Sequence, residues 1–143
     1  MKKLFLFVSA VAVAVSLNSC SSDSGGGGSS MSMKIDGVKK TFKTEATSSG
    51  GTTYVYGSIG PVDSPTEEVS FDLASGTGAD KVTDFYYNNA TDSYTPVTTM
   101  TSNVTTNSAT SAKGTFSGTL EPFGSGANVV VTEGTFNSKV TAQ

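Results

Sequence analysis

A strict alternation of apolar and polar residues, broken at short intervals by turn-forming residues, limits this chain to β-structure. Val69-Ser70-Phe71-Asp72-Leu73 alternates without a fault, as a strand with one buried face requires. Phe116, Gly118 and Leu120 share one face in the same way. No window places apolar residues at helical spacing over three turns. Low charge, 15% of residues, and a high content of Ser, Thr and Gly favour strands and turns further.

Turn signals separate the alternating segments. Asp36-Gly37, between Met33-Lys34-Ile35 and Val38, predicts a two-residue hairpin turn, because both central residues of such a turn have positive φ. Further signals recur at short spacing: Ser49-Gly50-Gly51, residues 61–65, Ser75-Gly76-Thr77-Gly78, residues 88–92, Asn107-Ser108 and Gly124-Ser125-Gly126. They predict an all-β fold, an antiparallel β-sandwich or barrel of about seven to nine short strands.

The same pattern predicts which side chains form the core. We expect residues 38–44 to be an edge strand, because lysines blunt an exposed sheet edge, and residues 129–132 to be buried on both faces. Gly-Thr-Phe occurs at 114–116 and again at 134–136, as expected where a glycine lies beside a buried phenylalanine. The expected core consists of Val38, Phe42, Val55, Ile59, Val69, Phe71, Leu73, Phe85, Phe116, Leu120, Val130 and Phe136.

The N-terminus has the organisation of an export signal. A basic pair precedes an apolar run over residues 4–15, and a short polar stretch ends at Cys20. The run is shorter than the ~20 residues that a helix needs to cross a bilayer. We therefore expect residues 1–19 to be a removable signal peptide, residues 20–30 to be an acylated cysteine with a flexible Gly/Ser tether, and residues 31–143 to be a single all-β domain.

Leu17-Asn18-Ser19-Cys20 resembles the lipobox of bacterial lipoproteins. The resemblance implies that Cys20 is acylated, by palmitate or a similar chain, and becomes the new N-terminus; two or three acyl chains hold a protein stably at a membrane. The following Ser-Ser-Asp-Ser and Gly/Ser stretch is similar to the start of lipoproteins of the Bacteroidetes group, in which acidic residues after the cysteine accompany export to the surface. The implied location is the cell envelope, lipid-anchored at the outer membrane, with exposure at the cell surface as a further implication.

Three blocks within the domain are also similar to a family. Residues 33–38, Gly114-Thr-Phe-Ser-Gly-Thr-Leu120 and Val131-Thr-Glu-Gly-Thr-Phe-Asn137 resemble recurring blocks of small all-β lipoproteins of Bacteroidetes, most of them of unknown function. The resemblance implies a surface or periplasmic β-domain. It brings no catalytic residues with it.

The side-chain inventory excludes several chemistries. With no histidine and a single cysteine, the chain has no Ser-His or Cys-His nucleophile and no His- or Cys-based metal or haem site, so we expect no cofactor, no metal and no enzyme activity. Calcium bound near Asp72, Asp80, Asp84 and the 88–92 loop is the weaker alternative to turn formation. A carboxylate-dependent hydrolase stays open through Glu67, Glu68, Asp72, Asp80, Asp84, Glu121 and Glu133.

The tyrosines are the candidate ligand-binding residues. If Val55 faces the core, Tyr54 and Tyr56 point outward, and Tyr86-Tyr87 must place one ring on each face. Exposed rings can stack on sugars or contact a protein, or can simply stabilise a sheet face. Seven lysines against twelve acids after Cys20 disfavour nucleic acid. The sequence thus predicts a non-enzymatic, membrane-anchored binding or accessory module for an envelope protein or a glycan, or alternatively an assembly subunit that docks by strand addition.

Overall fold

The computed structural model describes residues 28–61 and 63–143, and all regular structure in these ranges is β. The all-β prediction is confirmed. There are ten strands where seven to nine were expected: β1 (Ser30–Ile35), β2 (Val38–Ser49), β3 (Thr52–Ile59), β4 (Glu67–Leu73), β5 (Gly78–Ala79), β6 (Val82–Asn88), β7 (Ser93–Pro96), β8 (Thr101–Asn107), β9 (Ser111–Pro122) and β10 (Val129–Ala142).

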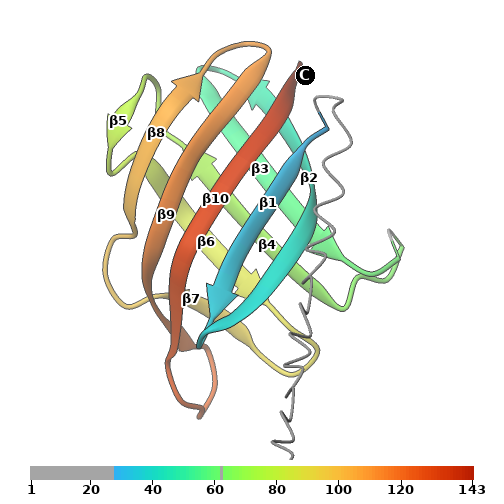
Figure 1. Cartoon of the computed structure of the whole chain (residues 1–143), viewed down its shortest axis with the longest axis vertical. Coiled ribbons are helices and arrows are strands. Elements are labelled where there is room, and N and C mark those ends of the chain that lie inside the picture. Colours follow the sequence, from blue (N-terminus) through green and yellow to red (C-terminus); the bar gives the residue numbers. More distant parts are fainter. Residues whose placement is uncertain (1–27, 62) are drawn as a thin grey trace, which may run out of the picture.

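The strands close into a barrel rather than a sandwich (Figure 1). Around the wall the order is β1, β2, β3, β4 and β6, followed by one position that β7 and β8 share, and then β9 and β10. β10 pairs with β1 and so closes the wall. β7 pairs with residues 120–122 of β9 and β8 with residues 112–117, so the two share one of the eight positions in the wall. Because neighbours in the wall are also neighbours in the chain, the fold is an up-and-down barrel.

β1 is a short strand between two long ones. Its six residues pair with β2 on one side and with β10 on the other. At the end of the barrel beyond the start of β1 at Ser30, β2 and β10 pair directly and in parallel, with Ala46–Ser48 against Val140–Ala142. The wall therefore stays closed where β1 is absent. Ser30 and the C-terminus lie at the same end of the barrel, which we call the terminal end; the turn at Asp36-Gly37 marks the opposite, hairpin end (Figure 1).

The predicted hairpin at Asp36-Gly37 is confirmed. It joins β1 to β2, with φ of 49° at Asp36 and 82° at Gly37, the left-handed pair that a type I′ turn needs. The Asp36 carboxylate also accepts a hydrogen bond from the backbone N–H of Val130 at 2.8 Å, and the Asp36 N–H donates to the Val130 carbonyl at 2.9 Å. The turn is thereby joined to the start of β10.

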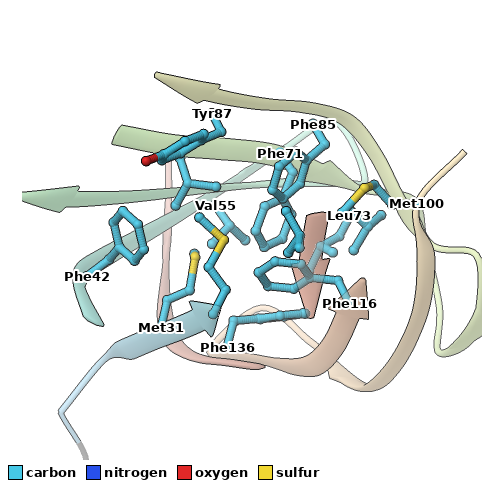
Figure 2. Close-up of a cluster of buried hydrophobic side chains, with 14 of the residues drawn as sticks. Met31, Phe42, Val55, Phe71, Leu73, Phe85, Tyr87, Met100, Phe116 and Phe136 are labelled. Atoms are coloured by element: carbon cyan, nitrogen blue, oxygen red, sulfur yellow. The ribbon is translucent and has the colours of Figure 1, made fainter. Parts of the chain in front are cut away.

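Aromatic rings from four strands fill the interior (Figure 2). The Phe71 ring centroid lies 5.8 Å from that of Phe85, 5.5 Å from that of Phe116 and 5.2 Å from that of Phe136. The offset and tilted arrangements are those that aromatic pairs prefer. The predicted core is confirmed at Phe42, Val55, Val69, Phe71, Leu73, Phe85, Phe116, Leu120 and Phe136, all of them buried, and Ile59 is partly buried against it.

The two Gly-Thr-Phe segments pair with each other. In the ladder between β9 and β10, Phe116 stands opposite Gly134 and Phe136 opposite Gly114. A Cβ atom on Gly134 would lie 2.6 Å from the Phe116 ring, and one on Gly114 would lie 2.8 Å from the Phe136 ring. Each glycine therefore makes room for the aromatic ring of the opposite strand. The repeat serves the packing of two adjacent strands.

Two core predictions are wrong. Val38 is 63% exposed because it directly follows the turn at the rim of the hairpin end, where it pairs with Ile35 of β1 but has no ladder partner on the side of β3. Val130 is 45% exposed because only Val131 of its run points fully inward, while Val129 packs partly against the core. The run at 129–132 thus has one buried face, as the wall of an antiparallel barrel requires.

The predicted edge strand is confirmed only in part. Residues 38–43 of β2 pair with β1 and residues 43–49 pair with β3, so β2 belongs to the closed wall, but residues 38–42 have no ladder partner on the side of β3. Docking by strand addition at this short segment therefore stays a prediction.

Candidate functional site

Three of the four predicted tyrosines reach the outer surface. Tyr54 is 44% exposed, Tyr86 is 42% exposed and Tyr56 is half-buried. Tyr87 is only 1% exposed and points into the barrel (Figure 2). The expectation of one ring on each face at Tyr86-Tyr87 is confirmed, and Tyr87 is corrected from a surface candidate to a core residue.

Strand register gathers the exposed tyrosines on one side of the barrel. Tyr56 of β3 stands beside Glu45 of β2 and beside Ser70 of β4, and Ser70 stands beside Tyr86 of β6. At ~4.8 Å between strands, the backbones at Tyr56 and Tyr86 are ~10 Å apart with only a serine side chain between them. We call the outer surface of β3, β4 and β6 the tyrosine face.

Two shallow hollows flank Tyr54 at one end of this face. One, of about 280 Å³, is lined by Tyr54 with Thr52 and Asp72, and the other, of about 240 Å³, by Tyr54 with Tyr56 and Glu45. Thr47 and Gln143 line both, and Ser49 lines the larger. The Tyr54 ring is thus shared by two hollows whose other walls carry hydroxyl, amide and carboxylate groups.

A hydrogen bond orients the second tyrosine. The Tyr56 hydroxyl donates to the Glu68 carboxylate on the neighbouring strand β4. Burial, with the Glu68 hydrogen bond and negative charge as smaller causes, raises the pKa of Tyr56 to about 12. The Tyr56 ring is therefore held in one orientation and stays protonated throughout the physiological range.

Phe123 extends the tyrosine face and was not predicted. It lies in the loop between β9 and β10, is 65% exposed, and its ring lies 6.3 Å from that of Tyr86 at an interplanar angle of 18°. The Phe123 N–H donates to the Ser93 carbonyl at 2.8 Å, which holds the loop against β7. An apolar ring between a proline and a glycine at a turn was the available sequence signal.

Tyr87 belongs to a polar cluster at the hairpin end of the interior. Its hydroxyl donates to Glu67 Oε2 at 2.6 Å, and Lys40 Nζ lies 2.6 Å from Glu67 Oε1. The Lys40 and Glu67 side chains are 23% and 19% exposed. Burial, and then the bond to Glu67, raises the pKa of Tyr87. The three inward-facing groups close this end over the aromatic core, which is a structural use of Glu67.

Among the remaining carboxylates of the described ranges, Asp72 and Asp84 are neighbours, and a carboxylate-dependent hydrolase stays an untested alternative. Asp72 pairs with Thr83, the residue before Asp84, so the two acids lie near each other on the outer wall. Burial, and then the negative charge of Asp84, raises the pKa of Asp72. Asp84 has a φ of 47° at a break in the register between β4 and β6. Within residues 28–61 and 63–143, no three acids or other metal-binding side chains are grouped to hold an ion. The Asn89 amide oxygen accepts backbone N–H bonds from Thr91 and Asp92, as a turn former does.

The comparisons match the chain to no protein-family model, no curated protein and no solved structure. The predicted lipidation site Cys20 and the signal peptide lie outside the described residues. Within the described ranges no helix has the length and hydropathy needed to span a bilayer.

Proposed function

We propose that this protein is a lipid-anchored lipoprotein of the cell envelope, at the outer membrane, and that its barrel is a non-enzymatic module that binds an extracellular glycan on the tyrosine face. The lipobox-like segment ending at Cys20 supports the anchor. The binding role rests on one observation, the Tyr54 ring shared by two polar hollows beside the oriented ring of Tyr56.

The chemistry of these hollows suits a sugar. Aromatic rings stack on the C–H face of a sugar ring, while carboxylate, amide and hydroxyl groups exchange hydrogen bonds with its hydroxyls. Glu45, Asp72, Thr47 and Gln143 supply such groups around Tyr54. The small side chain of Ser70 leaves the space between Tyr56 and Tyr86 open to a chain of sugar units.

A glycan array tests the binding role. We expect binding by the wild type, loss of at least about tenfold in affinity in Tyr54→Ala, and a smaller loss in Tyr56→Phe, which keeps the ring but not the bond to Glu68. Thr115→Ala, an exposed change on the opposite wall, is the matched control and should bind like the wild type. Unchanged binding in Tyr54→Ala, with folding verified by thermal melting, would contradict the proposal.

The anchor is tested separately by metabolic labelling with palmitate. The wild type should incorporate the label and fractionate with the outer membrane, and Cys20→Ala should do neither. Equal labelling of the two proteins would disprove acylation at Cys20. It would leave the glycan result unaffected.

A protein partner is the second candidate ligand. It is favoured by the stacked pair of Tyr86 and Phe123, which exposes more apolar ring area than the hollows around Tyr54. A partner that co-purifies in mild detergent and is lost in Phe123→Ala, with glycan binding absent, would favour this alternative.

A further inference from the structure

The charged side chains of the barrel wall are segregated by side. β3, β4 and β6 contain no lysine, and their outward acids are Glu68, Asp72 and Asp84. Five of the lysines, by contrast, point outward from β1, β2, β9 and β10: Lys34, Lys39, Lys43, Lys113 and Lys139. In a wall of eight positions β1 stands four places from β6, so β9, β10 and β1 lie opposite β4 and β6, while β2 with Lys39 and Lys43 adjoins β3; β9, β10 and β1 face the viewer in Figure 1.

Three of these lysines surround the point where the chain enters the barrel. Ser30, the first residue of β1, pairs with Lys43 on one side and with Asn137 on the other, and Asn137 pairs in turn with Lys113. The backbone N–H of Lys139 donates to the Ser29 hydroxyl at 2.9 Å. Any anchor upstream of Ser29 therefore leads into this group of ammonium ions.

Three outward carboxylates, Glu45, Glu121 and Glu133, accompany the five lysines on these strands, so lysines remain in excess. Glu133 is bound to Lys34 at 2.6 Å, and among the described residues Lys39, Lys43, Lys113 and Lys139 have no ion-pair partner. Glu45 follows Lys43 by two residues on β2 and also lines the hollow beside Tyr54, so it lies at the border between the lysine side and the tyrosine face. A hollow of about 340 Å³ on this side has Glu133 as its charged wall, so it does not suit an anion. The lysines offer a flat contact and not a pocket.

We propose that the lysine side of the barrel, centred on Lys43, Lys113 and Lys139, rests on anionic lipid headgroups of the membrane that anchors the protein, and so turns the outer surface of β4 and β6, with Tyr86, away from that membrane. The inference rests on the proposed lipid anchor. A barrel of eight strands is ~15 Å across its backbone. Acidic side chains on the far side of the barrel are thus farther from the headgroups than the Debye length, which is ~8 Å at about 0.15 M salt. The net negative charge of the protein therefore does not cancel the attraction between the lysines and the headgroups.

The test uses the acylated full-length protein on vesicles of phosphatidylcholine, with or without phosphatidylglycerol. Flotation with phosphatidylcholine alone reports the acyl anchor. Acetylation rates at each lysine, measured by mass spectrometry, report the contact. We expect phosphatidylglycerol to slow the reaction at Lys43, Lys113 and Lys139 several-fold, and not at Lys81, which lies at the start of β6 on the other side. High salt should abolish the difference. Equal rates on both vesicles would overturn the proposal.

A second arm separates this contact from the anchor. The chain from Ser21 contains every strand of the closed barrel, and its sedimentation with phosphatidylglycerol vesicles needs no acyl group. Each lysine near an anionic surface contributes about fivefold in affinity, so Lys43→Gln with Lys113→Gln and Lys139→Gln should lower binding about 100-fold, against little change in Lys81→Gln. Equal vesicle binding by the wild type and the triple variant would overturn the inference. Slower acetylation of these lysines in soluble polygalacturonate, but not on vesicles, would overturn it too.

Discussion

At the scale of single residues, a side chain in this barrel is often explained by the residue opposite it in the neighbouring strand. Gly114 and Gly134 look like weak points of β9 and β10 when each strand is considered alone. In the ladder they stand opposite Phe136 and Phe116, whose rings occupy the space that a Cβ atom would take. The repeated Gly-Thr-Phe was visible in the sequence, but its reciprocal pairing was not, because register is a property of two strands.

Gly134→Ala should destabilise the barrel by about 1–3 kcal/mol, because the new methyl group would lie 2.4 Å from the Phe116 carbonyl oxygen and 2.6 Å from its ring. Urea unfolding measures the change. Gly124→Ala, whose nearest atom would be 4.0 Å away, is the control and should stay within ~0.5 kcal/mol of the wild type. Similar stabilities of the two variants would show that Phe116 moves aside freely.

Tyr56 makes stability depend on pH in the alkaline range. Its pKa is raised from 10.0 to about 12, so between these values the unfolded chain loses the phenolic proton while the folded chain keeps it. The folded state then binds more protons, and the free energy of unfolding falls as pH rises from about 10 to about 12. Tyr87, whose pKa is also raised, contributes with the same sign.

Tyr56→Phe should therefore show a shallower fall in stability over this range than the wild type, and Glu68→Gln an intermediate one, since burial is the larger cause of the shift. Urea unfolding at stepped pH, with phenolate absorbance recorded in parallel, makes the comparison. An identical slope in wild type and Tyr56→Phe would rule out Tyr56 as a source of the dependence.

At the scale of elements, local signals were reliable where one turn or one strand decides the outcome. Asp36-Gly37 predicted its turn, and alternation in Val69–Leu73 predicted its buried face. The β2 lysines predicted an edge that is only partial, because β1 pairs with residues 38–43 while β3 pairs with β2 only from Lys43 onward. Period two placed Tyr54 and Tyr56 outward correctly and required one ring of Tyr86-Tyr87 on each face without saying which. Phe123 lies in a loop, where alternation makes no prediction.

The β1–β2 turn offers an element-scale test. Asp36→Ala loses the 2.8 Å bond from Val130 N–H and places a β-carbon without a compensating polar group at positive φ, so we expect a loss of about 1–3 kcal/mol. Asp36→Asn keeps an acceptor oxygen and tolerates the left-handed conformation, and should cost less than ~1 kcal/mol. Thermal melting of both variants decides: equal losses would mean that the connection to β10 adds nothing.

At the scale of the whole molecule, the interior couples opposite walls. Phe71 from β4 contacts Phe85 from β6, Phe116 from β9 and Phe136 from β10 (Figure 2). The polar cluster of Lys40, Glu67 and Tyr87 covers the core at the hairpin end. Strands that are far apart in the chain are thus held by one set of contacts, and we expect the barrel to unfold as one unit.

Phe71→Ala should cost about 3–5 kcal/mol, the range for removing a buried aromatic ring and leaving a cavity. Phe123→Ala removes the same ring from a site that is 65% exposed, and should change stability by less than ~1 kcal/mol. Equilibrium unfolding followed by far-ultraviolet circular dichroism and by tyrosine fluorescence should give coincident transitions for both. A small effect of Phe71→Ala would mean that the core repacks around the gap.

The chain by itself determined its β-structure, the sharpest turn and the inward or outward direction of most strand residues, because alternation and turn chemistry act over a few neighbouring residues. Only the tertiary structure decided that the sheet closes, that Val38 and Val130 stay exposed, and that tyrosines and lysines gather on different parts of the wall. Those outcomes depend on which strands become neighbours and in what register, and pairs distant in sequence set both.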